Sequence, residues 1–334
     1  MNRLVRAARG LKPAMNVQVG ALVLVLFGNW LLFPGFFNLS VQDGRLFGSL
    51  IDVLNRGAPV AILAIGMTLV IATRGVDLSV GAIMAVSGAI AATLVDAGYP
   101  AGAAIIVALA AGVICGMWNG ILIALLQMQP IVATLVLMVA GRGIAQLITK
   151  GSIVTFDDPW IDYLGTGAFL GLPIAPIILA VLAVASIVAV WRTALGLFIE
   201  AVGINPSAAR FSGLQSKLVL MLVYSFSGFC AGIAGVLAAA DIRGADANNA
   251  GLWLELDAIL AVVIGGTLLL GGRFSIVMSI IGAMIIQAMN TGILVSGLPP
   301  EFNLIVKAAV ILVILVLQSP RAAGWLRRKT GKQI

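Results

Sequence analysis

The sequence contains no histidine, only two cysteines and few charged residues. Without histidine it lacks the commonest metal ligand and the side chain most often used as a general base. Cys115 and Cys230 both fall inside apolar stretches, which disfavours a disulfide or a metal site. No nucleophile has a base at a catalytic spacing, so an intramembrane enzyme is the least favoured class of function.

Charged residues make up 10% of the 334 residues, whereas 61% are hydrophobic. This composition excludes an ordinary soluble domain. The apolar stretches are continuous rather than alternating, which excludes a membrane barrel. One helical crossing of a bilayer takes roughly 20 apolar residues, so the chain has room for about ten. The apolar run from Val17 has no A-x-A-like cleavage site after it, which predicts an uncleaved first span.

The apolar pattern therefore predicts an all-α polytopic membrane protein, with residues 1–334 forming one transmembrane domain. The expected spans lie near 17–37, 57–73, 80–96, 101–127, 131–149, 173–191, 217–240, 256–270, 276–295 and 303–318. An even number of spans places both termini on the same side of the membrane.

The net charge is +7, and the positions of the Lys and Arg residues along the chain indicate its orientation in the membrane. With the N-terminus in the cytoplasm, fourteen of the twenty Lys and Arg residues fall in cytoplasmic segments and four in external loops. The positive-inside rule thus favours cytoplasmic termini. The basic residues show no aromatic interleaving, so we expect no binding to nucleic acid.

Glycines recur every fourth residue in two predicted spans, at Gly112, Gly116 and Gly120 and again at Gly228 and Gly232. A face without side chains lets neighbouring helices approach closely in lipid. These glycines predict a compact helix bundle and carry no functional assignment.

Two short interruptions, residues 74–79 and 271–275, each place Gly, Arg and Ser between apolar segments. Spans two to five and seven to ten would run in opposite directions if they were equivalent, which is the arrangement of an inverted repeat. Any tight turn between two helices would need the same residue types, so the similarity fits either an inverted repeat or two unrelated turns.

Residues 192–216 form the longest predicted cytoplasmic connection. Asn205 followed by Pro206 indicates an N-cap with proline at the first helical position, and Gly213 can end the helix. We expect this capped helix to dock on a partner, although a plain surface connection would also fit.

Four of the polar or charged residues inside predicted spans are candidates for a function or for a charge pair. Arg142 and Gln146 lie four residues apart on one helical face, and we expect them to border a translocation path. Asp257 and Lys307 are expected to form a structural charge pair. The alternatives are that these side chains reach the interface, or that Asp77, Arg142, Asp257 and Lys307 serve an ion-coupled secondary transporter for a small polar solute.

Taken together, three stretches resemble the ABC-importer permeases for ribose, xylose, arabinose and related sugars: residues 66–81, 200–213 and 256–273. The resemblance runs from about residue 40 to 318, and residues 42–48 and 243–253 look most like the galactofuranose importer's permease. Residues 267–270, Thr-Leu-Leu-Leu, depart from the family, which usually has Ser after Thr.

This resemblance implies a cobalamin-importer-like (type II ABC importer) bundle of about ten helices. It also implies a second permease subunit, which in galactofuranose-type systems is a different chain, two ATPase subunits and a periplasmic sugar-binding protein. Residues 266–271 have P-loop spacing, but Gly272 and Arg273 stand where Lys and Ser or Thr are required. We therefore expect no cofactor in this chain, with ATP and Mg bound by the partner ATPase.

The residues expected to meet these partners form two groups. Coupling to the ATPase is assigned to Glu200, Ala201, Gly203, Asn205, Pro206, Ala208, Ala209, Arg210 and Gly213. Contact with the sugar-binding protein is assigned to Asp241, Arg243, Asp246, Asn248, Asn249 and Trp253, a polar rim around one aromatic residue.

The charge distribution generates a topology prediction. A reporter active only in the cytoplasm should be active when fused after Ile334, because the C-terminal segment carries five basic residues from Arg321 to Lys332. A fusion within residues 150–160 should report the opposite side. Activity of a periplasmic reporter at the C-terminus would contradict the predicted topology.

Overall fold

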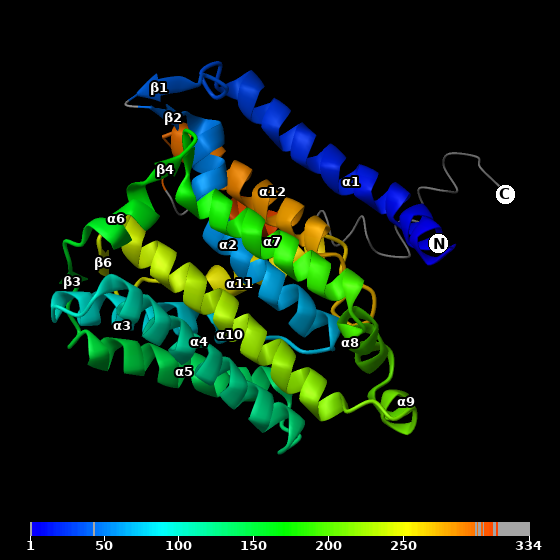
Figure 1. Cartoon of the computed structure of the whole chain (residues 1–334). Coiled ribbons are helices and arrows are strands. Elements are labelled where there is room, and N and C mark those ends of the chain that lie inside the picture. The colour runs from blue at the N-terminus through cyan, green and yellow to red at the C-terminus, as the bar shows by residue number, and fades with distance from the viewer. Residues whose placement is uncertain are drawn as a thin grey trace.

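The computed structural model describes residues 2–42, 44–297, 299, 302, 304–309 and 312, and these residues form a bundle of helices (Figure 1). The helices are α1 Asn2–Leu32, α2 Ser49–Ala72, α3 Val80–Asp96, α4 Ala101–Ala124, α5 Pro130–Ile148, α6 Pro159–Thr166, α7 Ile174–Arg192, α8 Leu195–Ile204, α9 Pro206–Phe211, α10 Ser216–Asp241, α11 Leu254–Ile264 and α12 Ile276–Val295. Three short antiparallel strand pairs join them: β1 Ser40–Gln42 with β2 Arg45–Phe47, β3 Val154–Thr155 with β6 Gly244–Ala245, and β4 Ala168–Phe169 with β5 Leu172–Pro173.

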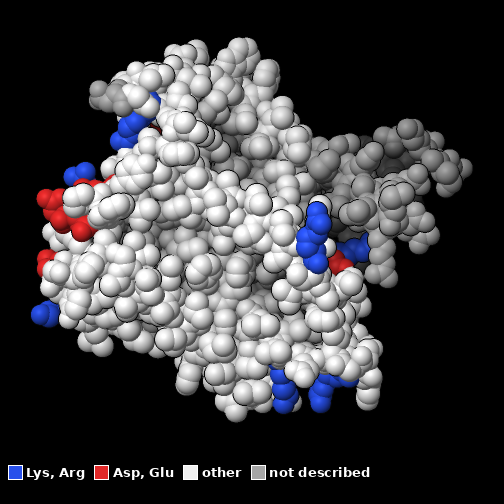
Figure 2. Space-filling model, in the orientation of Figure 1, with Lys and Arg blue, Asp and Glu red and all other residues white. Residues whose placement is uncertain are grey.

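The two ends of the bundle differ in structure and charge. One end carries α8 and α9, and the other carries α6 and the strands (Figure 1); they are called the α9 end and the α6 end. Acidic side chains gather mainly at the α6 end, together with a few basic ones, whereas the α9 end shows mostly basic side chains (Figure 2).

Among the described residues, six helices are long and apolar enough to cross a membrane: α2, α4, α5, α7, α10 and α12. The predicted spans 80–96 and 276–295 coincide with α3 and α12. The predicted span 256–270 is wrong as a full crossing, because α11 has only 11 residues and turns follow Ile264. Most of the predicted span 303–318 lies outside the described residues.

The core is built around α2, which is buried along its length from Gly57 to Ala72. It packs against α10, α12, α11 and α7. α10 in turn makes its most extensive contact with α4. An apolar helix enclosed by other helices needs no polar face, which explains why residues 57–72 of α2 are apolar apart from Thr68.

The predicted glycine faces of α4 and α10 meet each other. A Cβ on Gly112 would lie 2.6 Å from the carbonyl oxygen of Gly228, and one on Gly120 would lie 2.8 Å from the Cα of Met221. A Cβ on Gly228 would overlap the backbone of Gly112. The close packing expected from the sequence is confirmed, since only hydrogen atoms fit at these positions.

The chain between α2 and α3, residues 73–79, turns back into the bundle. Asp77 is fully buried and accepts hydrogen bonds from the amide and hydroxyl of Ser79 (3.0 and 2.6 Å) and from the Ser227 hydroxyl of α10 (2.8 Å). Asn119 of α4 donates to the Ser79 hydroxyl (2.8 Å). Because Ser227 lies well inside the 26-residue α10, α3 begins within the bundle rather than at its end.

A second irregular segment, residues 242–253, leads from the α6 end to the start of α11. Its Gly251 meets Gly81 in the first turn of α3, and a Cβ on either glycine would overlap the backbone of the other. α3 and α11 therefore begin beside each other in the interior.

The two interruptions that resemble each other in sequence lie side by side at the α9 end. The amide of Gly272 donates to the carbonyl of Ala72 (2.9 Å). Equivalent loops of an inverted repeat would lie at opposite ends of the bundle, so the resemblance of residues 74–79 to 271–275 does not come from such a repeat. Both segments are tight turns that need glycine.

The α4–α10 contact predicts the effect of one methyl group. Gly116→Ala should lower the thermal unfolding midpoint in detergent, because its Cβ would overlap the Tyr224 carbonyl. Overpacking costs about 1–3 kcal/mol, which outweighs the gain of about 1 kcal/mol from replacing glycine in a helix. Gly102→Ala, in the same helix with nothing within 4 Å of its Cβ, is the control and should not lower the midpoint. Equal midpoints for both variants would contradict the steric argument.

Candidate functional site

The predicted coupling segment contains two helices, α8 and α9, rather than one. The Asn205 side chain accepts hydrogen bonds from the amides of Ser207 (3.1 Å) and Ala208 (3.0 Å), as its predicted role as N-cap requires. Gly213 follows the helix with φ +84°. Pro206 begins α9, so the residues that start and end this helix agree with the sequence prediction.

The C-terminal end of α8 is fixed to the bundle through backbone contacts. A Cβ on Gly203 would overlap the Ala72 carbonyl and would lie 2.7 Å from the Gly272 amide nitrogen. Arg74, at φ +66°, donates from its guanidinium to the Ile204 carbonyl (2.5 Å). The segment that carries α9 therefore contacts both loops at this end of the bundle, one before α3 and one before α12.

The exposure of the coupling residues corrects one expectation. Ala209 was expected to approach a partner, but it is only 4% exposed and packs inward as part of the main core. Ala208 and Arg210 are exposed. Phe211 is 94% exposed and was missed. α9 has only six residues, fewer than two helical turns, so its sequence pattern could not show which face points inward.

Glu200 and Ala201 lie on α8, where both are half-buried. Burial raises the pKa of the Glu200 carboxyl above its usual value, and the positive charge of Arg273 opposes that rise. The Glu200 carboxyl thus interacts with Arg273 in the loop before α12.

The outer segment, residues 242–253, is held by side chains of its own and by α5. Asp246 accepts hydrogen bonds from the amides of Asn248 (3.0 Å) and Asn249 (3.3 Å) and from the Asn249 side chain (2.7 Å). The hydrogen bond from the Asn249 side chain is the main reason that the pKa of Asp246 is lowered, with the two amides and Arg142 adding to it. Asp246 therefore stays ionised at neutral pH and rigidifies the turn.

Arg142 and Gln146 both point from α5 to this outer segment. The Arg142 guanidinium donates to the carbonyls of Ala247 (3.0 Å) and Ala250 (2.6 Å). The Gln146 side chain donates to Asn248 (2.8 Å). The predicted sharing of one helical face is confirmed, and its observed consequence is that α5 holds the outer segment in place.

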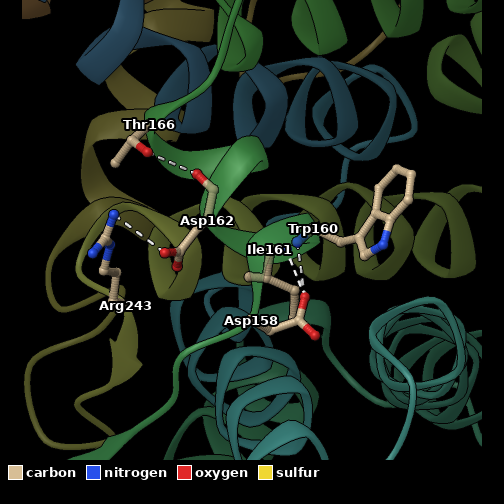
Figure 3. Close-up of polar contacts among 6 residues, drawn as sticks. All are labelled: Asp158, Trp160, Ile161, Asp162, Thr166 and Arg243. Atoms are coloured by element: carbon tan, nitrogen blue, oxygen red, sulfur yellow. Dashed lines mark hydrogen bonds and ion pairs between the residues drawn. The ribbon is translucent and has the colours of Figure 1, made fainter.

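A further contact fixes the start of the outer segment to α6. Arg243 lies 3.2 Å from the Asp162 carboxylate, and Asp158 caps α6 by accepting from the amides of Trp160 (2.9 Å) and Ile161 (3.2 Å) (Figure 3). The Arg243 side chain is 56% exposed, so water screens this pair and it adds at most about 1 kcal/mol.

The remaining predicted residues are placed as follows. Lys307 lies 2.8 Å from the Asp257 carboxylate, and the two side chains are 15% and 8% exposed. Trp253 is 57% exposed and has φ +66°. Asp241 is exposed at the end of α10.

Comparison with known proteins gives concordant matches. Residues 49–315 match the family described as branched-chain amino acid transport system, permease component. The galactofuranose transporter permease protein of Escherichia coli (strain K12) is 59% identical over 92% of this chain and 91% of its own length. The fructose import permease protein FruF of Bifidobacterium longum (strain NCC 2705) is 43% identical over 84% of this chain and 80% of its own length. The ribose import permease protein of Escherichia coli (strain K12) is 37% identical over 87% of this chain and 89% of its own length. No solved structure matches the chain.

The hydrogen bonds of Arg142 predict how firmly the outer segment is held. Arg142→Met should speed amide hydrogen exchange in residues 246–251 about tenfold or more, because a hydrogen bond from a charged group contributes about 1.5–3 kcal/mol. Arg243→Met removes only the exposed pair with Asp162 and is the matched control, with little change expected in the same amides. Unchanged exchange in Arg142→Met would show that α5 does not hold this segment.

Proposed function

The chain belongs to the family of permease components of branched-chain amino acid transport systems, and we propose that it is the permease subunit of an ABC importer for galactofuranose or a related monosaccharide. The observation that carries this proposal is the 59% identity to a galactofuranose permease over 92% of the chain. The permeases for fructose and ribose at 43% and 37% identity support a sugar over an amino acid as the substrate class. An ion-coupled transporter is not favoured.

In this proposal ATP and Mg are bound by a separate ATPase subunit, which docks on the α9 end. Three observations support that docking site: α9 is capped at both ends, its Phe211 is almost fully exposed, and Gly203 and Arg74 connect α8 to the loops of the bundle. Ala208, Pro206 and Arg210 would surround the aromatic ring on the exposed side. Ala209 would act by seating α9 on the bundle.

The α6 end is proposed to receive the periplasmic sugar-binding protein. Trp253, Asn248 and Asp241 are exposed there, and Asn248 also accepts a hydrogen bond from Gln146. Asp246 with Asn249 and Arg243 with Asp162 are paired within the chain. The first three would make contacts, and the other residues would shape the surface. Arg142 and Gln146 would border the sugar path from behind the outer segment, which they hold without touching the sugar, and Asp257 with Lys307 would be the structural charge pair.

We also propose the finer architecture. The chain lies in the bacterial inner membrane with both termini in the cytoplasm, next to a second permease that is either a copy or a different chain. An inverted repeat would relate α2 and α3 to α10 and α11. Its support is that irregular segments precede both α3 and α11, enter from opposite ends, and meet at Gly81 and Gly251.

The importer, reconstituted in liposomes with its ATPase and sugar-binding protein, should take up galactose that contains the furanose form only when ATP is present. Phe211→Ala should lower uptake and the affinity of the ATPase subunit about thirtyfold or more, because an aromatic anchor in an interface contributes about 2 kcal/mol or more. The control, Phe169→Ala, removes an exposed ring at the α6 end and should leave ATPase affinity unchanged. Sugar uptake without ATP would refute the importer, and normal affinity in Phe211→Ala would refute the docking site alone.

A further inference from the structure

A cavity of about 430 Å³ lies inside this single chain at the α6 end. Its volume is within the range of about 300–1,000 Å³ typical of small-molecule sites. Polar residues line it from four parts of the chain: α2, the outer end of α10 with the outer segment, the start of α11, and α12. They are Asn55, Arg56, Asp241, Asp246, Asn249, Asp257, Gln287 and Asn290.

The remaining wall is apolar and combines larger side chains, such as those of Met84 and Leu254, with small residues. Gly88 of α3 and Gly235 of α10 are two of the small ones, at the place where the two helices touch. Gly88 and Gly235 each lie against the backbone of the facing helix, so neither position accepts a larger side chain. The lining contains no aromatic side chain among the described residues, so a flat apolar ligand would find no ring to stack on.

The carboxamides of this cavity are only partly paired. Asn290 donates a hydrogen bond to the Gln287 side-chain oxygen (3.4 Å), whereas among the described residues the Nε2 atom of Gln287 donates none. The Oδ1 atoms of Asn55 and Asn290 also lack partners within the described part of the chain, but they are enclosed and expose no surface to the cavity. Because a polar group without a partner costs about 1–3 kcal/mol, the unpaired Nε2 atom of Gln287 favours a ligand that accepts a hydrogen bond.

We propose that this cavity is a monosaccharide-binding site contained within one permease chain. Sugar hydroxyls supply both donors and acceptors, and they match a lining that combines carboxamides with the carboxylates of Asp241 and Asp246. Gly251 forms part of the floor, and its contact with Gly81 closes the cavity toward the α9 end. The inference rests on the proposed sugar import and adds the location of the bound sugar.

The location is distinct from the face of α5. Neither Arg142 nor Gln146 lines the cavity, yet Arg142 bonds to the carbonyl of Ala250, which does. A sugar passing between two permease chains along α5 would contact Gln146 and leave Asn290 untouched. The two routes therefore predict that bound sugar shields different residues from a labelling reagent: Asn290 for the cavity, and Gln146 for a path along α5.

The test is thiol labelling of the assembled importer in nanodiscs. Starting from a variant with Cys115→Ala and Cys230→Ala, Asn290→Cys is labelled from outside with a charged methanethiosulfonate in the presence of galactose, ribose or leucine. At a sugar concentration about ten times the dissociation constant, labelling should slow about tenfold, because only empty sites react. Gln287→Cys, which also lines the cavity and is assigned no contact with a partner, should give the same result if Asn290→Cys fails to assemble.

Two control positions separate the outcomes. Gln146→Cys on α5 and Trp160→Cys on α6, at a residue 77% exposed and outside the cavity, should be labelled at the same rate with and without sugar. Protection of Gln146→Cys but not of Asn290→Cys or Gln287→Cys would overturn the inference, while uptake by the same importer would leave the proposed function intact. Protection of the cavity by leucine rather than galactose or ribose would overturn the sugar assignment. Absence of ATP-driven sugar uptake in the unmodified importer would instead refute the proposed function.

Discussion

The buried carboxylate of Asp77 is the interaction on which the interior of this bundle depends. A helix that begins inside a membrane protein exposes amide groups that water cannot reach, and each unpaired group is costly. Asp77 satisfies the amide of Ser79, and through Ser227 and Asn119 it ties the start of α3 to α10 and α4. Gly81 follows at once, and its lack of a side chain admits Gly251. Without this arrangement α3 and α11 could not begin side by side.

The meeting of the two irregular segments gives the bundle a short mechanical connection between its ends. α11 starts beside Gly81 and, at 11 residues, is roughly 16 Å long. The turns after it lead to Gly272, which bonds to Ala72 and adjoins Gly203 of α8. These contacts form a continuous path from α8 through the turns and α11 to the outer segment, apart from the long helices.

Much of this arrangement was predictable from the sequence where local rules decide. The cap at Asn205, the glycine faces of α4 and α10, and the limits of α3 and α12 follow from short-range chemistry. The truncation of α11 was missed because residues 256–270 are apolar throughout, although Gly265-Gly266 carries a local signal: Gly266 takes φ +84° directly after the helix, as a C-terminal glycine does. The inward position of Ala209 depends on tertiary contacts, which a run of small residues does not encode.

The charged residues of the interior fit transport of an uncharged solute better than a cycle of ion binding and release. Arg142 donates to two backbone carbonyls, and Asp257 is paired with Lys307. Groups bound in this way have their charges paired by contacts within the chain. Gln287 of the cavity instead keeps a free donor, because its Nε2 atom has no acceptor among the described residues. A neutral amide binds a polar, uncharged solute without binding ions tightly, and the cost of its unpaired donor is recovered only when such a solute occupies the cavity.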